Sequence, residues 1–158
     1  MHDGVIGLTL LKSATHPNVD ADREFHSFTY SLMPHEGGWR EAGTVWQAYA
    51  LNNSPVALVK DTAGVALPQR FSLASLDCPN VVLEVVKQAE EEDALVLRLY
   101  ECYNRRTQCT LSLGLPVAEA YACNLMERHD EPVDCEADRI SLCFRPYEIK
   151  TLKLYTGR

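Results

Sequence analysis

Residues 81–113 read VVLEVVKQAEEEDALVLRLYECYNRRTQCTLSL, and this stretch decides the fold. Apolar residues occupy every second position over 81–85 and again over 95–99, which is the period of a strand with one buried face. The acidic run at 90–93 separates the two segments and predicts a hairpin whose tip is a solvated turn. Asn104-Arg105-Arg106 then leads to a further alternating segment at 109–113, which predicts a third strand in a meander. Because each strand has one apolar face, the sheet needs a second layer, and an all-β domain is expected.

Other segments add strands and one helix. Residues 25–33 alternate most clearly of all, with His26, Phe28, Tyr30 and Leu32 on one face. Residues 39–51 have apolar residues three and four apart and predict a helix. Further strands are predicted at 5–12, 56–60, 71–76, 117–125, 139–144 and 147–155. Residues 1–158 therefore predict one domain, an antiparallel β-sandwich with one short helix, with jelly-roll and immunoglobulin-like arrangements both open.

The charge balance excludes some classes of partner. The chain has 22 acidic and 15 basic residues and a formal net charge of -7. Nucleic acids and anionic membranes bind basic surfaces, so neither is expected as a partner, whereas neutral sugars stay open. The N-terminal residues have no basic region or cleavage site of a signal peptide, and no apolar run approaches the roughly 20 residues of a membrane span.

Six cysteines stand at 78, 102, 109, 123, 135 and 143, without a CxxC pair or a Cys/His cluster at zinc-finger spacing. Cys102 and Cys109 flank the predicted turn and could face each other, but Cys78 is expected in a loop and Cys143 in a strand. We interpret all six as reduced thiols, which predicts a cytoplasmic protein.

Acidic and histidine side chains recur at even spacing over residues 16–26. They are His16, Asp20, Asp22, Glu24 and His26. An extended backbone would project them to one side, as a metal site or an acid-base cluster requires. The competing interpretation is a solvated loop that leads into a strand, with His26 as a hydrogen-bonded residue of the apolar face.

Three aromatic residues raise the question of sugar binding. Trp39, Trp46 and Tyr49 could form a platform for a sugar ring, but their helical spacing favours core packing. The sequence has no GxSxG, no phosphate-binding glycine loop, no HExxH and no cysteine beside a fitting histidine. We therefore expect no self-contained enzyme from these residues.

Four stretches together resemble one family. They are the HxFxYxLxPH pattern at 26–35, PNVVLEVVKxAE from 79, LxLRLYE from 95 and PYEIKTLKL at 146–154. From about Leu8 to Leu154 the chain is similar to the C-terminal β-sandwich region of family 38 glycoside hydrolases, the retaining α-mannosidases. Glu24 and Cys78 depart from the family pattern, where glycine and serine are expected in loops.

The resemblance implies a larger parent enzyme whose chemistry lies upstream. In that family an N-terminal α/β domain supplies an aspartate nucleophile and a zinc ion, and retaining hydrolysis needs a second acid-base group. None of those motifs is in this sequence, and together with the abrupt start at Met1 this predicts an incomplete sandwich cut from a larger enzyme. The segment itself is expected to be non-catalytic and to hold no cofactor, with zinc in the parent's catalytic domain. The parent's catalytic domain is the expected partner of this segment, and mannosides are expected to bind through the parent. An exposed sheet edge would also favour a homo-oligomer.

The resemblance also implies sugar-side or domain-interface contacts for His26, Tyr30, His35 and Asn53, against core or loop-structural roles. Two other functions remain to be weighed. One is a free-standing carbohydrate-binding module. The other is a small metal-dependent hydrolase built on His16, Asp20, Asp22 and His26.

Overall fold

The computed structural model describes residues 4–59, 70–129 and 131–156. Contacts divide the chain into two compact units, Met1–Gly38 and Trp39–Arg158. The helix and all the strands of the described residues lie in the second unit, which therefore carries the fold. Within the described part of the chain, no helix is both long and apolar enough to cross a membrane.

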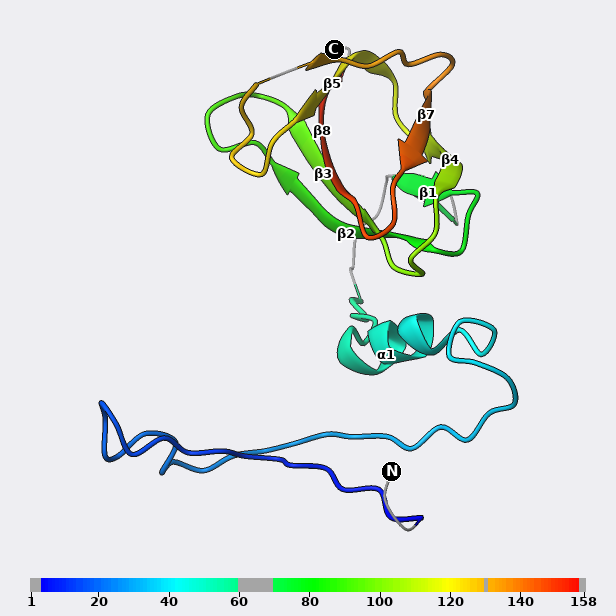
Figure 1. Ribbon diagram of the computed structural model, residues 1–158. Coiled ribbons are helices and arrows are strands. Elements are labelled where there is room, and N and C mark those ends of the chain that lie inside the picture. The colour runs from blue at the N-terminus through cyan, green and yellow to red at the C-terminus, as the bar shows by residue number, and fades with distance from the viewer. Residues whose placement is uncertain (1–3, 60–69, 130, 157–158) are drawn as a thin grey trace. The chain divides into compact units, whose positions relative to one another are not determined.

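Two antiparallel sheets make up most of the second unit (Figure 1). The larger sheet has the order β2-β3-β8-β5-β6 and the smaller one β1-β4-β7. The elements are α1 (Thr44–Asn52), β1 (Ala74–Leu76), β2 (Val81–Gln88), β3 (Leu95–Glu101), β4 (Thr107–Leu113), β5 (Val117–Cys123), β6 (Glu131–Pro132), β7 (Arg139–Phe144) and β8 (Ile149–Thr156). The prediction of an antiparallel β-sandwich with one short helix is confirmed.

The core lies between the two sheets and takes side chains from both. Its fully buried members are Val81, Leu97, Leu99, Leu111, Ile140, Phe144, Leu152 and Leu154. Burying one such aliphatic or aromatic side chain stabilises the fold by about 1.5–3 kcal/mol. The apolar alternation of the sequence thus marks the faces that meet here.

The predicted hairpin is confirmed, because β2 and β3 pair in antiparallel register from Val81↔Glu101 to Gln88↔Leu95. Its tip is more than a solvated turn, however. Lys153 Nζ lies 3.1 Å from Glu92 Oε2, although the lysine side chain is only 1% exposed. A buried ammonium is costly unless it is paired, so one acidic residue of the tip compensates a charge inside the sheet.

The predicted meander is wrong in its third strand. β4 leaves β3 and enters the smaller sheet, where it lies between β1 and β7. β8 takes the place beside β3, with Leu97 opposite Leu152. Alternation identifies a strand but does not indicate which strand lies beside it. β8 is buried on both faces over residues 151–154, as is expected of a strand in the centre of a sheet. The turn does use a left-handed residue, since Asn104 has φ 59°.

Helix α1 begins later than predicted. Residues 39–43 form turns, and Gly43 in the left-handed conformation, with φ 63°, precedes the first helical residue. No residue of α1 is buried. Trp46 is 40% exposed, so the prediction that it packs in a core is wrong, whereas Tyr49 is half-buried and packs, with Val45, against the buried cluster of Val82, Cys102 and Tyr103.

Three predicted strands do not form within the described residues. Residues 6–12, 25–33 and 56–59 have no strand structure, Val5 forms only a β-bridge, and Lys60 lies outside the described residues. Phe25, Leu32 and Val56 are 95%, 78% and 83% exposed. A strand needs a neighbour for its backbone N–H and C=O groups, and an alternating pattern alone does not supply one.

Candidate functional site

A buried carboxylate organises one end of the sandwich. Glu101, the last residue of β3, is 0% exposed. Its Oε1 accepts hydrogen bonds from Asn80 Nδ2 at 2.9 Å and from the backbone N–H of Tyr103 at 2.7 Å. Its Oε2 accepts from the backbone N–H groups of Arg105 at 3.2 Å and Tyr147 at 3.0 Å. One side chain thereby joins three loops.

These hydrogen bonds fix the ionisation of Glu101. Burial raises the pKa of its carboxyl, but the bonds from Tyr147, Asn80, Tyr103 and Arg105 outweigh burial, and the pKa is lowered. The group is ionised at neutral pH and its lone pairs are committed to protein donors. It is a structural anion, not a group free to exchange protons with a substrate.

Acid is expected to destabilise the chain through this carboxylate. The folded-state pKa of Glu101 lies below its ordinary value of 4.5, so its stabilisation is fully present above pH 4.5. It is lost as the pH falls from there through the folded-state pKa. Urea unfolding at a series of pH values should give a steeper acid loss for the native chain than for Glu101→Gln. Parallel pH profiles would contradict this assignment.

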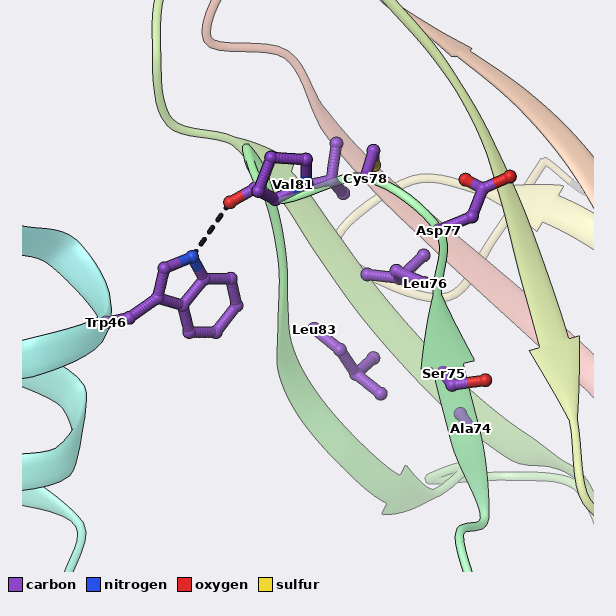
Figure 2. Close-up of a pocket in the computed structure, with 9 residues that line it drawn as sticks. Trp46, Ala74, Ser75, Leu76, Asp77, Cys78, Val81 and Leu83 are labelled. Atoms are coloured by element: carbon purple, nitrogen blue, oxygen red, sulfur yellow. Dashed lines mark hydrogen bonds between the residues drawn. The ribbon is translucent and has the colours of Figure 1, made fainter. Parts of the chain in front are cut away.

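Polar atoms of aromatic and arginine side chains attach the region of α1 to the sandwich. Trp46 Nε1 donates to the carbonyl oxygen of Pro79 at 2.8 Å (Figure 2). Arg40 Nε donates to the carbonyl oxygen of Tyr103 at 2.8 Å, and the Tyr103 hydroxyl donates back to the Arg40 carbonyl at 3.2 Å. The Trp39 ring stands edge-on to the Tyr103 ring, with centroids 5.3 Å apart. The helix is thus held at the same end that Glu101 organises.

A second cluster joins α1 to the larger sheet. The Tyr49 hydroxyl donates to a Glu84 carboxylate oxygen and lies 2.8 Å from the Tyr100 hydroxyl. Desolvation by burial and the Glu84 hydrogen bond raise the pKa of Tyr49, which stays protonated. The cluster borders an open hollow of about 500 Å³ that is also lined by Tyr147 and Ile149. Rings beside hydroxyl and carboxylate oxygens can bind a polar ligand such as a sugar.

A second hollow, of about 520 Å³, lies beside β1 and β2 (Figure 2). Trp46 borders it from α1, and Leu76, Val81 and Leu83 are among its apolar lining residues. Asp77 and Cys78 line it in the loop that follows β1. An apolar opening between strands of the two sheets is suited to contact with another protein surface.

Comparison with known proteins identifies the fold family. Residues 80–152 match the family model described as the glycosyl hydrolases family 38 C-terminal beta sandwich domain. Over 95% of its length the chain is 40% identical to alpha-mannosidase 2C1 of Mus musculus. This is a family 38 C-terminal β-sandwich. Alpha-mannosidase 2C1 of Homo sapiens has the same identity and coverage, and alpha-mannosidase G of Dictyostelium discoideum is 28% identical over 98% of the chain. The chain spans about 15% of the length of the curated relatives it matches.

In this family 38 sandwich, the residues predicted to contact a sugar or another domain lie in both units. His26, Tyr30 and His35 lie in the first unit and Asn53 in the second. His26 Nε2 hydrogen-bonds the Asp22 carbonyl oxygen at 3.0 Å, and Tyr30 is 69% exposed. Asn53 ends α1, where its backbone N–H donates to the Tyr49 carbonyl oxygen at 2.8 Å. Their roles toward a sugar or another domain remain predictions.

The alternating cluster at residues 16–26 does not assemble a metal site. Asp20 pairs with Arg23 at 2.8 Å, and His26 bonds the backbone of Asp22. Among the described residues, the one group with ligand atoms close enough for a metal ion is Asp77, Cys78 and Cys109. The six cysteines are all free thiols, as predicted.

Sequence reasoning missed Glu101 and Asn80. The signal was present, because Leu97, Leu99 and Glu101 share one face of an alternating strand. A charged residue in register with buried leucines needs several hydrogen-bond donors. The family 38 sandwich supplies them from loops, which alternation does not predict.

Proposed function

We propose that this chain is the non-catalytic C-terminal sandwich of a retaining α-mannosidase that hydrolyses terminal α-mannosyl residues. Its role is to support the catalytic domain of the parent polypeptide and to shape part of the sugar cleft. The relatives that carry the name α-mannosidase are far longer than this chain, which supports a parent with further domains. In this proposal, zinc and the catalytic carboxylates belong to the parent's catalytic domain.

One observation carries the supporting role. Residues 25–33 have the alternation of a strand, yet Phe28, Tyr30 and Leu32, which share one face of that alternation, are 47%, 69% and 78% exposed. Exposed apolar side chains in a regular pattern mark a surface that another protein surface covers. Pairing with strands of the parent would satisfy the backbone of this segment and bury these side chains together. His26, Tyr30 and His35 would then face the catalytic domain or its sugar cleft.

A substitution at this segment tests the proposal. In the natural polypeptide that contains this sequence, Leu32→Asp is expected to lower both the thermal midpoint and the hydrolysis of p-nitrophenyl α-mannoside, because a carboxylate would enter an apolar interface. In the isolated chain the same change should alter the free energy of unfolding by no more than about 0.5 kcal/mol.

Met126→Asp is the matched control, because Met126 is also exposed, at 73%, but lies outside the alternating segment. Equal effects of the two substitutions on the natural polypeptide would refute an interface at residues 25–33. A loss of stability in the isolated Leu32→Asp chain would do so as well.

The hollow beside Tyr49 and Tyr100 favours a second candidate, a carbohydrate-binding module. Titration of the isolated chain with methyl α-mannoside, followed by NMR, separates the two functions. Chemical-shift changes confined to Tyr49, Tyr100 and Tyr147 would favour the module. Unchanged spectra would leave the supporting role as the function. The reduced state of the six cysteines supports a cytoplasmic location for either.

A further inference from the structure

We propose that Asp77, Cys78 and Cys109 form a binding site for a thiophilic divalent cation, with Zn²⁺ as the fitting ion. One carboxylate oxygen and the two Sγ atoms of these residues lie within 4.8 Å of one another. Two sulfur ligands and one oxygen ligand are a donor set that zinc accepts, with a water molecule in the fourth tetrahedral position.

Strand pairing brings the two thiols together. β1 pairs with β4 through Leu76↔Leu111, and the backbone N–H of Asp77 donates to the Thr110 carbonyl oxygen at 3.3 Å. The pairing thus continues past β1 and sets Cys78 beside Cys109, with their Sγ atoms within 4.8 Å of each other. Cys109 thus meets Cys78 of the loop that follows β1, whereas Cys102 is not part of the group.

The separations suit a metal ion after a small side-chain movement. Zinc lies about 2.3 Å from thiolate sulfur and about 2.0–2.2 Å from carboxylate oxygen, so ligand atoms around it are about 3.5–4 Å apart. The observed limit of 4.8 Å is slightly wider. Rotation about the side chain of Cys78, which is only half-buried, can close the difference.

The carboxylate is already oriented. Asp77 Oδ1 accepts a hydrogen bond from the backbone N–H of Thr110 at 2.7 Å. Metal-binding carboxylates are commonly held by such a second hydrogen bond, which fixes their direction. The same bond lowers the pKa of Asp77, so the group carries its charge without a metal.

Access and charge also favour a cation. Asp77 and Cys78 line the hollow of Figure 2, and Cys109 is buried behind them at 2% exposure. The net charge of -7 raises the local concentration of cations. The incoming ion displaces the thiol protons to solvent and binds both sulfurs as thiolates.

Such an ion would restrain the loop that leads into β2. This loop carries Pro79, which accepts the Trp46 hydrogen bond, and Asn80, which donates to Glu101. The sequence predicts no cofactor in this segment, and the proposed metal site differs from that prediction. Cys78 and Cys109 are far apart in the sequence, so their spacing does not indicate a shared site.

Metal titration of the reduced full chain tests the site. Cd²⁺ reports thiolate ligation by its sulfur-to-metal absorption, and Zn²⁺ affinity follows from competition with a chromophoric chelator. We expect one ion per chain with both metals. Cys78→Ser should weaken Zn²⁺ binding at least about tenfold and reduce the Cd²⁺ absorption. Cys143→Ser is the matched control, because Cys143 is an exposed cysteine of β7, and it should change neither readout.

Asp77→Asn provides a second test, since its amide oxygen can still accept the Thr110 hydrogen bond while the charge is lost. It should weaken Zn²⁺ binding and leave the Cd²⁺ sulfur absorption in place at saturation. Urea unfolding of each metal-free variant checks that the fold persists. Absence of a one-to-one complex, or equal losses in Cys78→Ser and Cys143→Ser, would overturn the site. These readouts do not depend on mannosidase activity.

Discussion

Replacement of Glu101 by alanine is expected to lower the free energy of unfolding by about 3–5 kcal/mol. The variant leaves four donors without their acceptor: Asn80 Nδ2 and the Tyr103 N–H, which are buried, and the backbone N–H groups of Arg105 and Tyr147, which are part-buried. Each buried donor without a partner costs about 1–3 kcal/mol, reduced where water enters. Urea denaturation followed by circular dichroism measures the loss.

The control for this prediction is Glu131→Ala, because Glu131 is an exposed glutamate on β6 of the same sheet. It should change the free energy of unfolding by no more than about 0.5 kcal/mol. Equal effects of the two substitutions would show that Glu101 does not organise the end of the sandwich.

Phe144→Ala is expected to cost about 3–5 kcal/mol of stability, because it opens a cavity between the two sheets. Phe144 is 0% exposed, ends β7 and pairs with Thr107 of β4 in the smaller sheet. Its side chain belongs to the core that also contains Leu97 and Leu152 of the larger sheet. The loss should appear as a lower urea midpoint with an unchanged slope.

Phe25→Ala offers a matched comparison, because Phe25 is 95% exposed. The same chemical change there should leave the stability of the isolated chain within about 0.5 kcal/mol of the native value. If the two phenylalanine variants lost equal stability, Phe144 would not be the residue that joins the sheets.

Sequence alternation predicts the faces of strands but not their neighbours. The buried positions of β3 follow from the period of two at Leu97 and Leu99. The same period at residues 25–33 gives no strand, and β4 pairs in the other sheet. Both errors have one cause, because backbone pairing depends on segments that are distant in the sequence. For residues 25–33, the described residues supply no such neighbouring strand.

The candidate site was less accessible to prediction than the fold. The turn at Asn104 was predicted from a residue tolerant of positive φ. The hydrogen bonds of Glu101 come from three separate loops, and the meeting of Cys78 with Cys109 depends on the register of β1 against β4. Such contacts follow from tertiary structure, and local patterns do not encode them.

The proposed supporting role is tested most directly by the intact mass of the natural polypeptide, captured from source cells with an antibody raised against this chain. The proposal predicts a product several times heavier than 17.7 kDa, with a catalytic domain on the same polypeptide. A natural product of 17.7 kDa would contradict it and would make the carbohydrate-binding module the leading function.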